Sequence, residues 1–162
     1  MFQEISKCPV LKGLDSSELQ YAFSGLNFNI KTFEKDALIM NSGDKCNYMM
    51  ILIEGEVRGE MMDFSGNSIK IEDIPAPKPI ASAFLFGQKA ECPVTILANC
   101  FSRILFIPRD EVIKLMQRNS QILMNYLNII SSRGQFLSQK IKLLSLKSLK
   151  QRIAYYLLEQ DG

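Results

Sequence analysis

The hydrophobic pattern at the start of the chain is that of a helix. Apolar residues recur at the spacing of one helix face between Leu14 and Leu26. Asp15 precedes this run and Glu18 follows three positions later, an order typical of an N-cap with a capping box. We therefore expect a helix that begins just after Asp15.

The pattern changes to that of β-strands between residues 28 and 108. Three turn glycines, Gly43, Gly55 and Gly66, stand 12 and 11 residues apart, and each is expected to adopt a positive φ. The prolines between 75 and 79 are expected to interrupt strand pairing. The regular turns predict an all-β sandwich, barrel or jelly roll. The predicted strands are 28–33, 37–40, 48–53, 56–62, 67–74, 94–98 and 102–108.

After Pro108 the pattern becomes helical again. Pro108 and the acids that follow it predict a helix over about 109–117, and Asn119 with Ser120 predicts the cap of a long helix over about 121–144. Large apolar residues recur along this long helix at alternating steps of four and three. This a/d spacing predicts pairing with the same helix of a second subunit. The stripe, called the seam below, consists of Leu123, Leu127, Ile130, Gly134, Leu137, Ile141 and Leu144.

A second apolar stripe lies on another face of the same helix and consists of Ile122, Tyr126, Ile129 and Phe136. It is predicted to pack on the β body of its own chain. The alternative is that both stripes pack within one chain. We prefer the dimer, because little other helical mass is present to cover the seam.

Composition places the chain among ordinary globular proteins. Its 162 residues, 47% of them hydrophobic and 22% charged, are enough for one domain with an appendage. Neither a run of about 18 apolar residues nor a signal-peptide pattern is present, so we expect a cytoplasmic protein without membrane contact. Residues 1–111 carry 11 basic and 15 acidic side chains, whereas 112–158 carry eight basic and no acidic ones. This asymmetry favours a nucleic-acid partner, but a solvated lysine-rich helix face explains it equally well.

The usual side chains of metal and catalytic sites are missing. The sequence has no histidine, and its four cysteines, Cys8, Cys46, Cys92 and Cys100, form no CxxC pair. We therefore expect no haem, iron–sulfur cluster or zinc and no enzymatic activity, since a cupin-type enzyme would need histidine ligands. The cysteines are expected to be buried or half-buried free thiols, with a thiol sensor or a thiolate ligand as the alternative.

Residues 33–71, FEKDALIMNSGDKCNYMMILIEGEVRGEMMDFSGNSIKI, resemble the cyclic-nucleotide-binding β-roll of Crp/Fnr-type transcription regulators. Residues 101–119 resemble the last strand and following helix of that family, and 120–144 resemble its dimerisation helix. The resemblance implies a mainly β fold, a double-stranded β-helix or jelly roll with flanking helices. It divides the chain into a sensor domain (1–118), a dimerisation helix (119–145) and the start of a truncated winged helix-turn-helix (146–162). DNA contact would then require a C-terminal domain that is absent from this chain.

In this family a loop between two strands binds the cyclic nucleotide. The resemblance places its Gly-Glu pair on Ala81 and Ser82 and its Arg-Ser pair on Cys92 and Pro93. The acid that binds the ribose and the arginine that binds the phosphate are therefore both replaced, and we expect no binding of cyclic AMP or cyclic GMP. The candidate effector-pocket residues of this loop are Ala81, Ser82, Phe84, Phe86, Gly87, Gln88, Cys92, Pro93, Val94 and Thr95.

The apolar side chains of the loop favour a small, partly apolar effector, and the alternative is that they fill the core of the roll. The resemblance implies the effector-sensing and dimerisation module of a homodimeric Crp/Fnr-type regulator. The alternative function is that of a stand-alone ligand-binding or interaction domain, which regulates another protein without contacting DNA.

Overall fold

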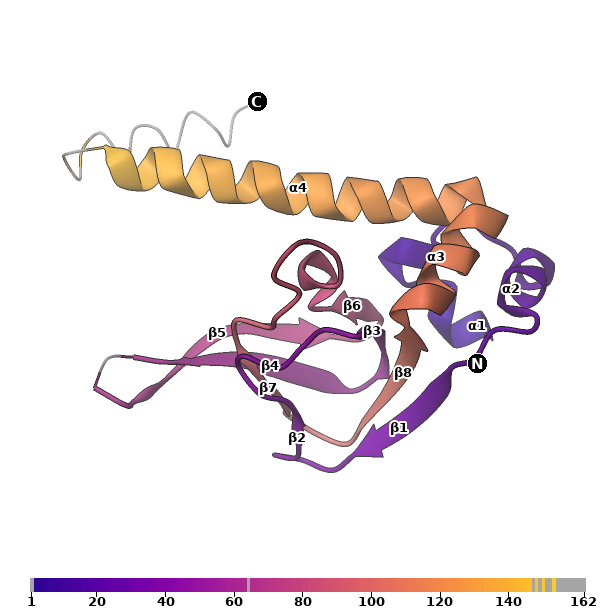
Figure 1. Cartoon of the computed structure of the whole chain (residues 1–162). Helices are drawn as coiled ribbons and strands as arrows, with labels where there is room; N and C mark the ends of the chain where they lie inside the picture. Colours follow the sequence, from indigo (N-terminus) through magenta and orange to yellow (C-terminus); the bar gives the residue numbers. More distant parts are fainter. Residues whose placement is uncertain (1, 64, 147, 149, 151–152, 154–162) are drawn as a thin grey trace. The chain divides into compact units, whose positions relative to one another are not determined.

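Figure 1 shows the computed structural model of the chain, which describes residues 2–63, 65–146, 148, 150 and 153. The chain forms two compact units, Met1–Leu127 and Asn128–Gly162, and each is described by itself. The predicted start of a winged helix-turn-helix at 146–162 lies almost entirely outside the described residues. Within the described ranges, no helix combines the length and the hydropathy needed to cross a membrane.

The predicted N-terminal helix is present and is capped as expected. Asp15 Oδ1 accepts hydrogen bonds from the backbone N–H groups of Ser17 and Glu18, both at 2.8 Å, and the Glu18 side chain accepts one from the Asp15 N–H at 2.9 Å. Two shorter helical segments precede it, and both are too short to show a hydrophobic period. The three elements are α1 (Phe2–Ile5), η1 (Pro9–Leu11) and α2 (Ser16–Phe23).

In the described residues, eight antiparallel strands form two four-stranded sheets, with the order β1-β8-β3-β6 in sheet A and β2-β7-β4-β5 in sheet B. All seven predicted strands are present, each within one residue of its predicted bounds, and the predicted jelly-roll class is confirmed. The strands are β1 (Asn29–Phe33), β2 (Leu38–Met40), β3 (Tyr48–Glu54), β4 (Glu56–Met62), β5 (Ser68–Pro75), β6 (Lys78–Ile80), β7 (Thr95–Ala98) and β8 (Ser102–Pro108).

The expectation that the prolines interrupt pairing holds at Pro77, in the bend between β5 and β6, but is wrong at Pro75 and Pro79. Pro75 is the last residue of β5, and Pro79 lies inside β6, opposite Ile51 of β3. β6 is an edge strand of sheet A, and an edge strand has one side on which no N–H is needed for pairing. A proline is therefore tolerated at this position.

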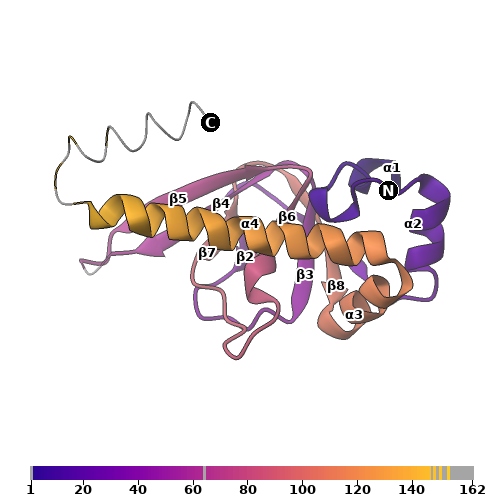
Figure 2. The ribbon, with the colours of Figure 1, turned by 90° about the horizontal axis from the view of Figure 1, so that it is seen from above.

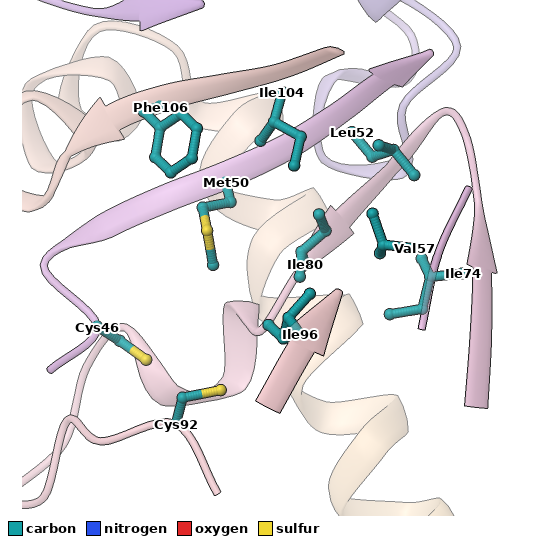
Figure 3. Packing of buried hydrophobic residues seen from close by; sticks show 10 residues of the cluster. All are labelled: Cys46, Met50, Leu52, Val57, Ile74, Ile80, Cys92, Ile96, Ile104 and Phe106. Atoms are coloured by element: carbon teal, nitrogen blue, oxygen red, sulfur yellow. The ribbon is translucent and has the colours of Figure 1, made fainter. Parts of the chain in front are cut away.

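The two central strands of sheet A, β3 and β8, are buried on both faces. Met50 and Leu52 of β3 point into the roll, where they form one core with Ile104 and Phe106 of β8 and with residues of sheet B such as Val57 (Figure 3). The alternate residues Met49 and Ile51 of β3 and Leu105 and Ile107 of β8 are also fully buried, and α1 and α3 (Arg109–Arg118) contact β3 on that side. Figures 1 and 2 both place α1, α2 and α3 at the end of this unit opposite the β4–β5 hairpin.

The long helix α4 (Ser120–Ser145) is also confirmed, with bounds close to those predicted. Asn119 caps it, because its Oδ1 accepts hydrogen bonds from the backbone N–H groups of Gln121 at 2.9 Å and Ile122 at 3.3 Å. Of the second stripe, Ile122 and Tyr126 are buried in the first unit as predicted, whereas in the second unit Ile129 is half-buried and Phe136 is 55% exposed.

All four cysteines are free, as expected. Cys8, Cys46 and Cys92 are buried, but Cys100 is exposed, contrary to the expectation of at least partial burial. Cys100 lies in the turn between β7 and β8, where its side chain has no inner face of a sheet to occupy.

The turn glycines have the predicted positive φ. At Gly55 the backbone of a neighbouring segment, Phe101 and Ser102, also comes close to the glycine. At φ +90°, a Cβ on Gly55 would collide with the carbonyl oxygen of Phe101 and with Ser102, whereas Gly66 has φ +84° and open space around it.

We expect Gly55→Ala to lower the free energy of unfolding by about 3 kcal/mol, from left-handed strain and forced displacement together. Gly66→Ala carries the strain alone and should cost about 1–2 kcal/mol. Urea denaturation measures both, and equal losses would show that the close approach at Gly55 has no energetic weight.

Candidate functional site

The candidate loop, residues 80–95, leaves the roll through one residue in an unusual backbone conformation. Ala81 has φ +51° and ψ +22°, the left-handed region that favours glycine. It starts the short helix η2 (Ser82–Phe84), and the Phe84 N–H donates to the Ala81 carbonyl at 3.0 Å. The resemblance places a glycine of the family at position 81, and a left-handed backbone there is one that glycine adopts readily.

Ser82, the position to which the resemblance assigns the family's acid, is enclosed by its surroundings. The residue is 3% exposed, and its carbonyl oxygen accepts a hydrogen bond of 2.7 Å from the Tyr126 hydroxyl of α4. Burial raises the pKa of Tyr126 to about 12, although the charge of Arg109 acts in the opposite direction. The phenol therefore stays protonated at neutral pH and donates to the loop.

The ring of Phe86 joins the loop to both C-terminal helices. It meets the Tyr126 ring edge-on with 5.8 Å between centroids, and the Arg109 guanidinium of α3 lies 5.0 Å from its centroid. Arg109 was not among the predicted site residues, and Tyr126 was predicted only as part of a packing stripe. The sequence could have indicated a role for Tyr126, because a tyrosine on a buried stripe needs a hydrogen-bond partner for its hydroxyl.

Cys92, the position to which the resemblance assigns the family's arginine, is part of the core of the roll (Figure 3). Its thiol donates to the Val94 carbonyl at 3.2 Å, and burial raises its pKa. Burial likewise raises the pKa of the neighbouring Cys46 to about 11. Phe84 and Val94 pack against the same core. Both thiols are therefore protonated at neutral pH, and no positive charge replaces the missing guanidinium at position 92.

The second half of the loop is tied to the turn before β3. The Gly43 N–H donates to the Cys92 carbonyl at 2.8 Å, and the Ser42 hydroxyl donates to the Pro93 carbonyl at 3.1 Å. The Ser42 N–H donates to the Thr95 hydroxyl at 3.2 Å. These bonds fix the loop at its C-terminal end, as Tyr126 does at its N-terminal end.

The predicted effector residues thus divide by exposure. Ser82 and Cys92 are buried, and the tip residues Gly87 and Gln88, together with Pro93, are exposed. The half-buried members are Ala81, Phe84, Phe86, Val94 and Thr95. In the part of the chain that the structure describes, no group of three or more Cys, Asp and Glu side chains is arranged to hold a metal ion.

The seam of α4 is largely exposed in the single chain. The exposed fraction is 38% for Leu123, 47% for Leu127, 60% for Leu137 and 68% for Ile141. A Cβ added to Gly134 would meet nothing within 4 Å. The helix therefore presents a stripe of large apolar side chains with one position free of bulk.

Comparison with known proteins places this geometry in a family. The model of the cyclic nucleotide-binding domain matches residues 30–119, more than half of the chain. A comparison with curated protein sequences found no match.

Solved structures of transcription regulators have the same fold. A transcriptional regulator from Thermotoga maritima is 25% identical with a TM-score of 0.73, over 82% of this chain and 98% of that one. The catabolite activator protein of Thermus thermophilus is 19% identical (TM-score 0.71; 85% and 63% covered). The sensor domain of the regulator DNR from Pseudomonas aeruginosa is 19% identical (TM-score 0.70; 91% and 93% covered). The match of the family model to residues 30–119, on a roll of eight antiparallel strands, shows that the chain belongs to the cyclic nucleotide-binding domain family.

Proposed function

We propose that the chain is the effector-sensing and dimerisation module of a Crp/Fnr-type transcription regulator, without enzymatic activity. The observation that carries the proposal is the buried hydrogen bond between the Tyr126 hydroxyl and the Ser82 carbonyl. It links the loop that binds the ligand in this family to the first turns of the long helix. The family match and the likeness to transcription regulators support the same function.

Sensing in this proposal is a shift between two packings of the loop on α4. The effector would enter beside Phe86, whose ring is held between Arg109 and Tyr126. An effector shifts the equilibrium only by its difference in affinity for the two packings. The aromatic rings of Phe84 and Phe86 suit a small, partly apolar molecule.

The proposal excludes cyclic AMP and cyclic GMP as effectors. The positions of the acid and the arginine are taken by the buried residues Ser82 and Cys92. A phosphate without its buried cationic partner loses about 3–5 kcal/mol of binding energy. Pro93 also lacks the N–H that an amide cradle would use.

The exposed seam supports dimerisation through α4. Large apolar side chains exposed in a row are typical of a surface that another protein covers. In this proposal the seam pairs with the same helix of a second chain, and Gly134 allows the two backbones to approach closely. DNA contact would belong to a winged helix-turn-helix domain. Residues 146–162 resemble the start of such a domain.

A thermal-shift assay tests the exclusion of cyclic nucleotides. Tight binding to the folded state must raise its stability by mass action, by about 2.7 kcal/mol at a ligand concentration of 100 Kd. We expect no change in Tm with cyclic AMP or cyclic GMP, and no difference from AMP as a control. A rise in Tm with micromolar cyclic AMP would contradict the proposal.

The seam is tested by adding charge to it. Leu127→Glu with Ile141→Glu should convert the dimer into a monomer, because paired helices cannot bury unpaired carboxylates without a large cost. Size-exclusion chromatography with light scattering measures the mass. Ser132→Glu with Gln139→Glu adds the same charge on the opposite side of α4 and should leave a dimer. If the parent chain is itself monomeric, or if both double variants dimerise, the seam is not an interface.

The bond between loop and helix is tested by Tyr126→Phe. Removing the buried hydroxyl leaves the Ser82 carbonyl without its shortest hydrogen bond, which should cost about 1 kcal/mol and lower Tm by a few degrees. Amide signals of the loop should shift in NMR spectra. Tyr21→Phe removes a hydroxyl from a residue that is 74% exposed and serves as the control. If both substitutions change Tm and the loop amide signals equally little, the Tyr126 hydrogen bond does not connect the loop to α4 in the proposed mechanism.

A further inference from the structure

A second pocket lies where the two sheets of the roll part. It has a volume of about 330 Å³ and is lined from β1, β2, the residues that lead into β3, and β8. β1 and β2 are edge strands of different sheets, and in the described part of the chain β1 pairs only with β8 and β2 only with β7. The sheets therefore leave a mouth between these edges. The volume lies in the lower range of small-ligand pockets, about 300–1,000 Å³.

Two aromatic rings form the apolar part of this pocket. Phe106, on the inner face of β8, is 8% exposed and belongs to the core of the roll. Tyr48, at the start of β3, meets it edge-on with 6.1 Å between ring centroids. Two rings at an interplanar angle of 79° provide a floor and a wall for a flat apolar group.

Polar residues at inward positions of β1 explain why the pocket is not filled. Asn29 lies directly opposite Phe106 in the register, and Lys31 is two residues further along the same face. Phe33, the next residue on this face, packs on the core, whereas Lys31 and Asn29 line the pocket. The Lys31 ammonium lies 5.1 Å from the Phe106 ring centroid. This end of the roll thus combines an aromatic floor with a cation at its edge.

The pocket carries an excess of positive charge. Lys31 and Lys45 line it, together with a single acid, Asp44, whose Oδ2 accepts a hydrogen bond from the Asn41 N–H at 2.8 Å. Among the described residues, neither lysine takes part in an ion pair. A pocket with the Lys31 ammonium beside an aromatic ring and Lys45 in its lining suits a ligand with a flat apolar body and one negative group.

We propose that this pocket binds small aromatic carboxylates, with the ring against Phe106 and Tyr48 and the carboxylate on Lys31 and Lys45. A smaller hollow of about 200 Å³ shares Asn29, Tyr48 and Phe106 with the pocket and extends it towards Phe28 and Pro108. No charged residue lines this extension. The site therefore accepts a longer ligand where the added part is apolar.

This site shares no residue with the loop 80–95, but its wall is bonded to that loop. The Cys92 N–H donates to the Asp44 carbonyl at 2.9 Å, and the Cys46 N–H donates to the Ala90 carbonyl at 2.8 Å. The Asn47 carbonyl accepts from the N–H of Arg109, the first residue of α3, at 2.9 Å. A ligand that orders residues 44–48 therefore acts on the loop and on α3 through backbone hydrogen bonds.

NMR titration of the whole ¹⁵N-labelled chain tests the proposal with phenylacetate and 3-phenylpropanoate as probes. Both should shift amide signals of residues 29–31 and 44–48 saturably, and acetate and phenylacetamide should bind at least about tenfold more weakly, because each lacks one half of the recognition. Lys31→Met with Lys45→Met should weaken phenylacetate by at least about tenfold. Lys7→Met with Lys12→Met makes the same change in charge away from the pocket and should leave binding unchanged.

Several results would overturn the proposal. One is the absence of saturable shifts at residues 29–31 and 44–48 with either aromatic acid up to about 10 mM, where even a millimolar ligand is largely bound. Shifts confined to residues 81–95 would place the ligand in the family's loop instead. If the two double variants weaken phenylacetate binding equally, Lys31 and Lys45 act only through the net charge of the protein and do not contact the carboxylate. If the variant Lys31→Met with Lys45→Met is unfolded, as a loss of spectral dispersion would show, the single variants Lys45→Met and Lys12→Met are compared instead. Lys45 is exposed, so its substitution should leave the fold intact.

Discussion

Strands β3 and β8 bury both of their faces, and this double burial determines where the other parts of the first unit lie. Met50 and Phe106 point into the roll, and their neighbours Met49 and Ile107 point to the helices. A slip of one residue in the pairing would exchange these two sets, so the register is strongly specified. With the register fixed, α3 continues from β8 and α4 starts at the Asn119 cap. In this position of α4 the Tyr126 hydroxyl donates to the Ser82 carbonyl of the loop.

The loop 80–95 is held in its conformation without any buried charged side chain of its own. Ala81 keeps a left-handed conformation that costs an alanine about 1–2 kcal/mol. The surroundings stabilise it, since η2 closes on the Ala81 carbonyl and Tyr126 donates to Ser82. Cys92 at the other end is anchored in the core. Hydrophobic burial and backbone hydrogen bonds thus maintain the shape, while the chemistry of the lining is free to change.

The strands, the capped helices and the family could be predicted from the sequence because each rests on local patterns. Short elements escaped prediction: α1 is only four residues long, and Pro79 in β6 reads as a strand breaker unless the strand is known to be at an edge. The partner of the Tyr126 hydroxyl lies 44 residues away and is a backbone carbonyl, which leaves no trace in side-chain patterns. The pocket at Phe106 escaped for a similar reason. Its lining joins β1, β2, β3 and β8, and only the register shows that Lys31 lies on the same face as Phe106.

The segment 42–48 connects the two sites that we propose, and this has a thermodynamic consequence. Its backbone is bonded to the loop through Gly43 and Cys46 and to α3 through Asn47, while its side chains line the second pocket. If a ligand in the pocket changes the affinity of the loop for an effector, the effector must change the affinity of the pocket by the same factor. Such coupling requires that the segment differ between two states, since bonds that are equally strong in both transmit nothing. Ser42 is the natural place for that difference. It is exposed, and its two hydrogen bonds to Pro93 and Thr95, at 3.1 and 3.2 Å, are longer than the backbone bonds beside them. The bonds of Ser42 are therefore the longest of those that tie residues 42–48 to the loop, and they lie two residues from Asp44 in the lining of the pocket.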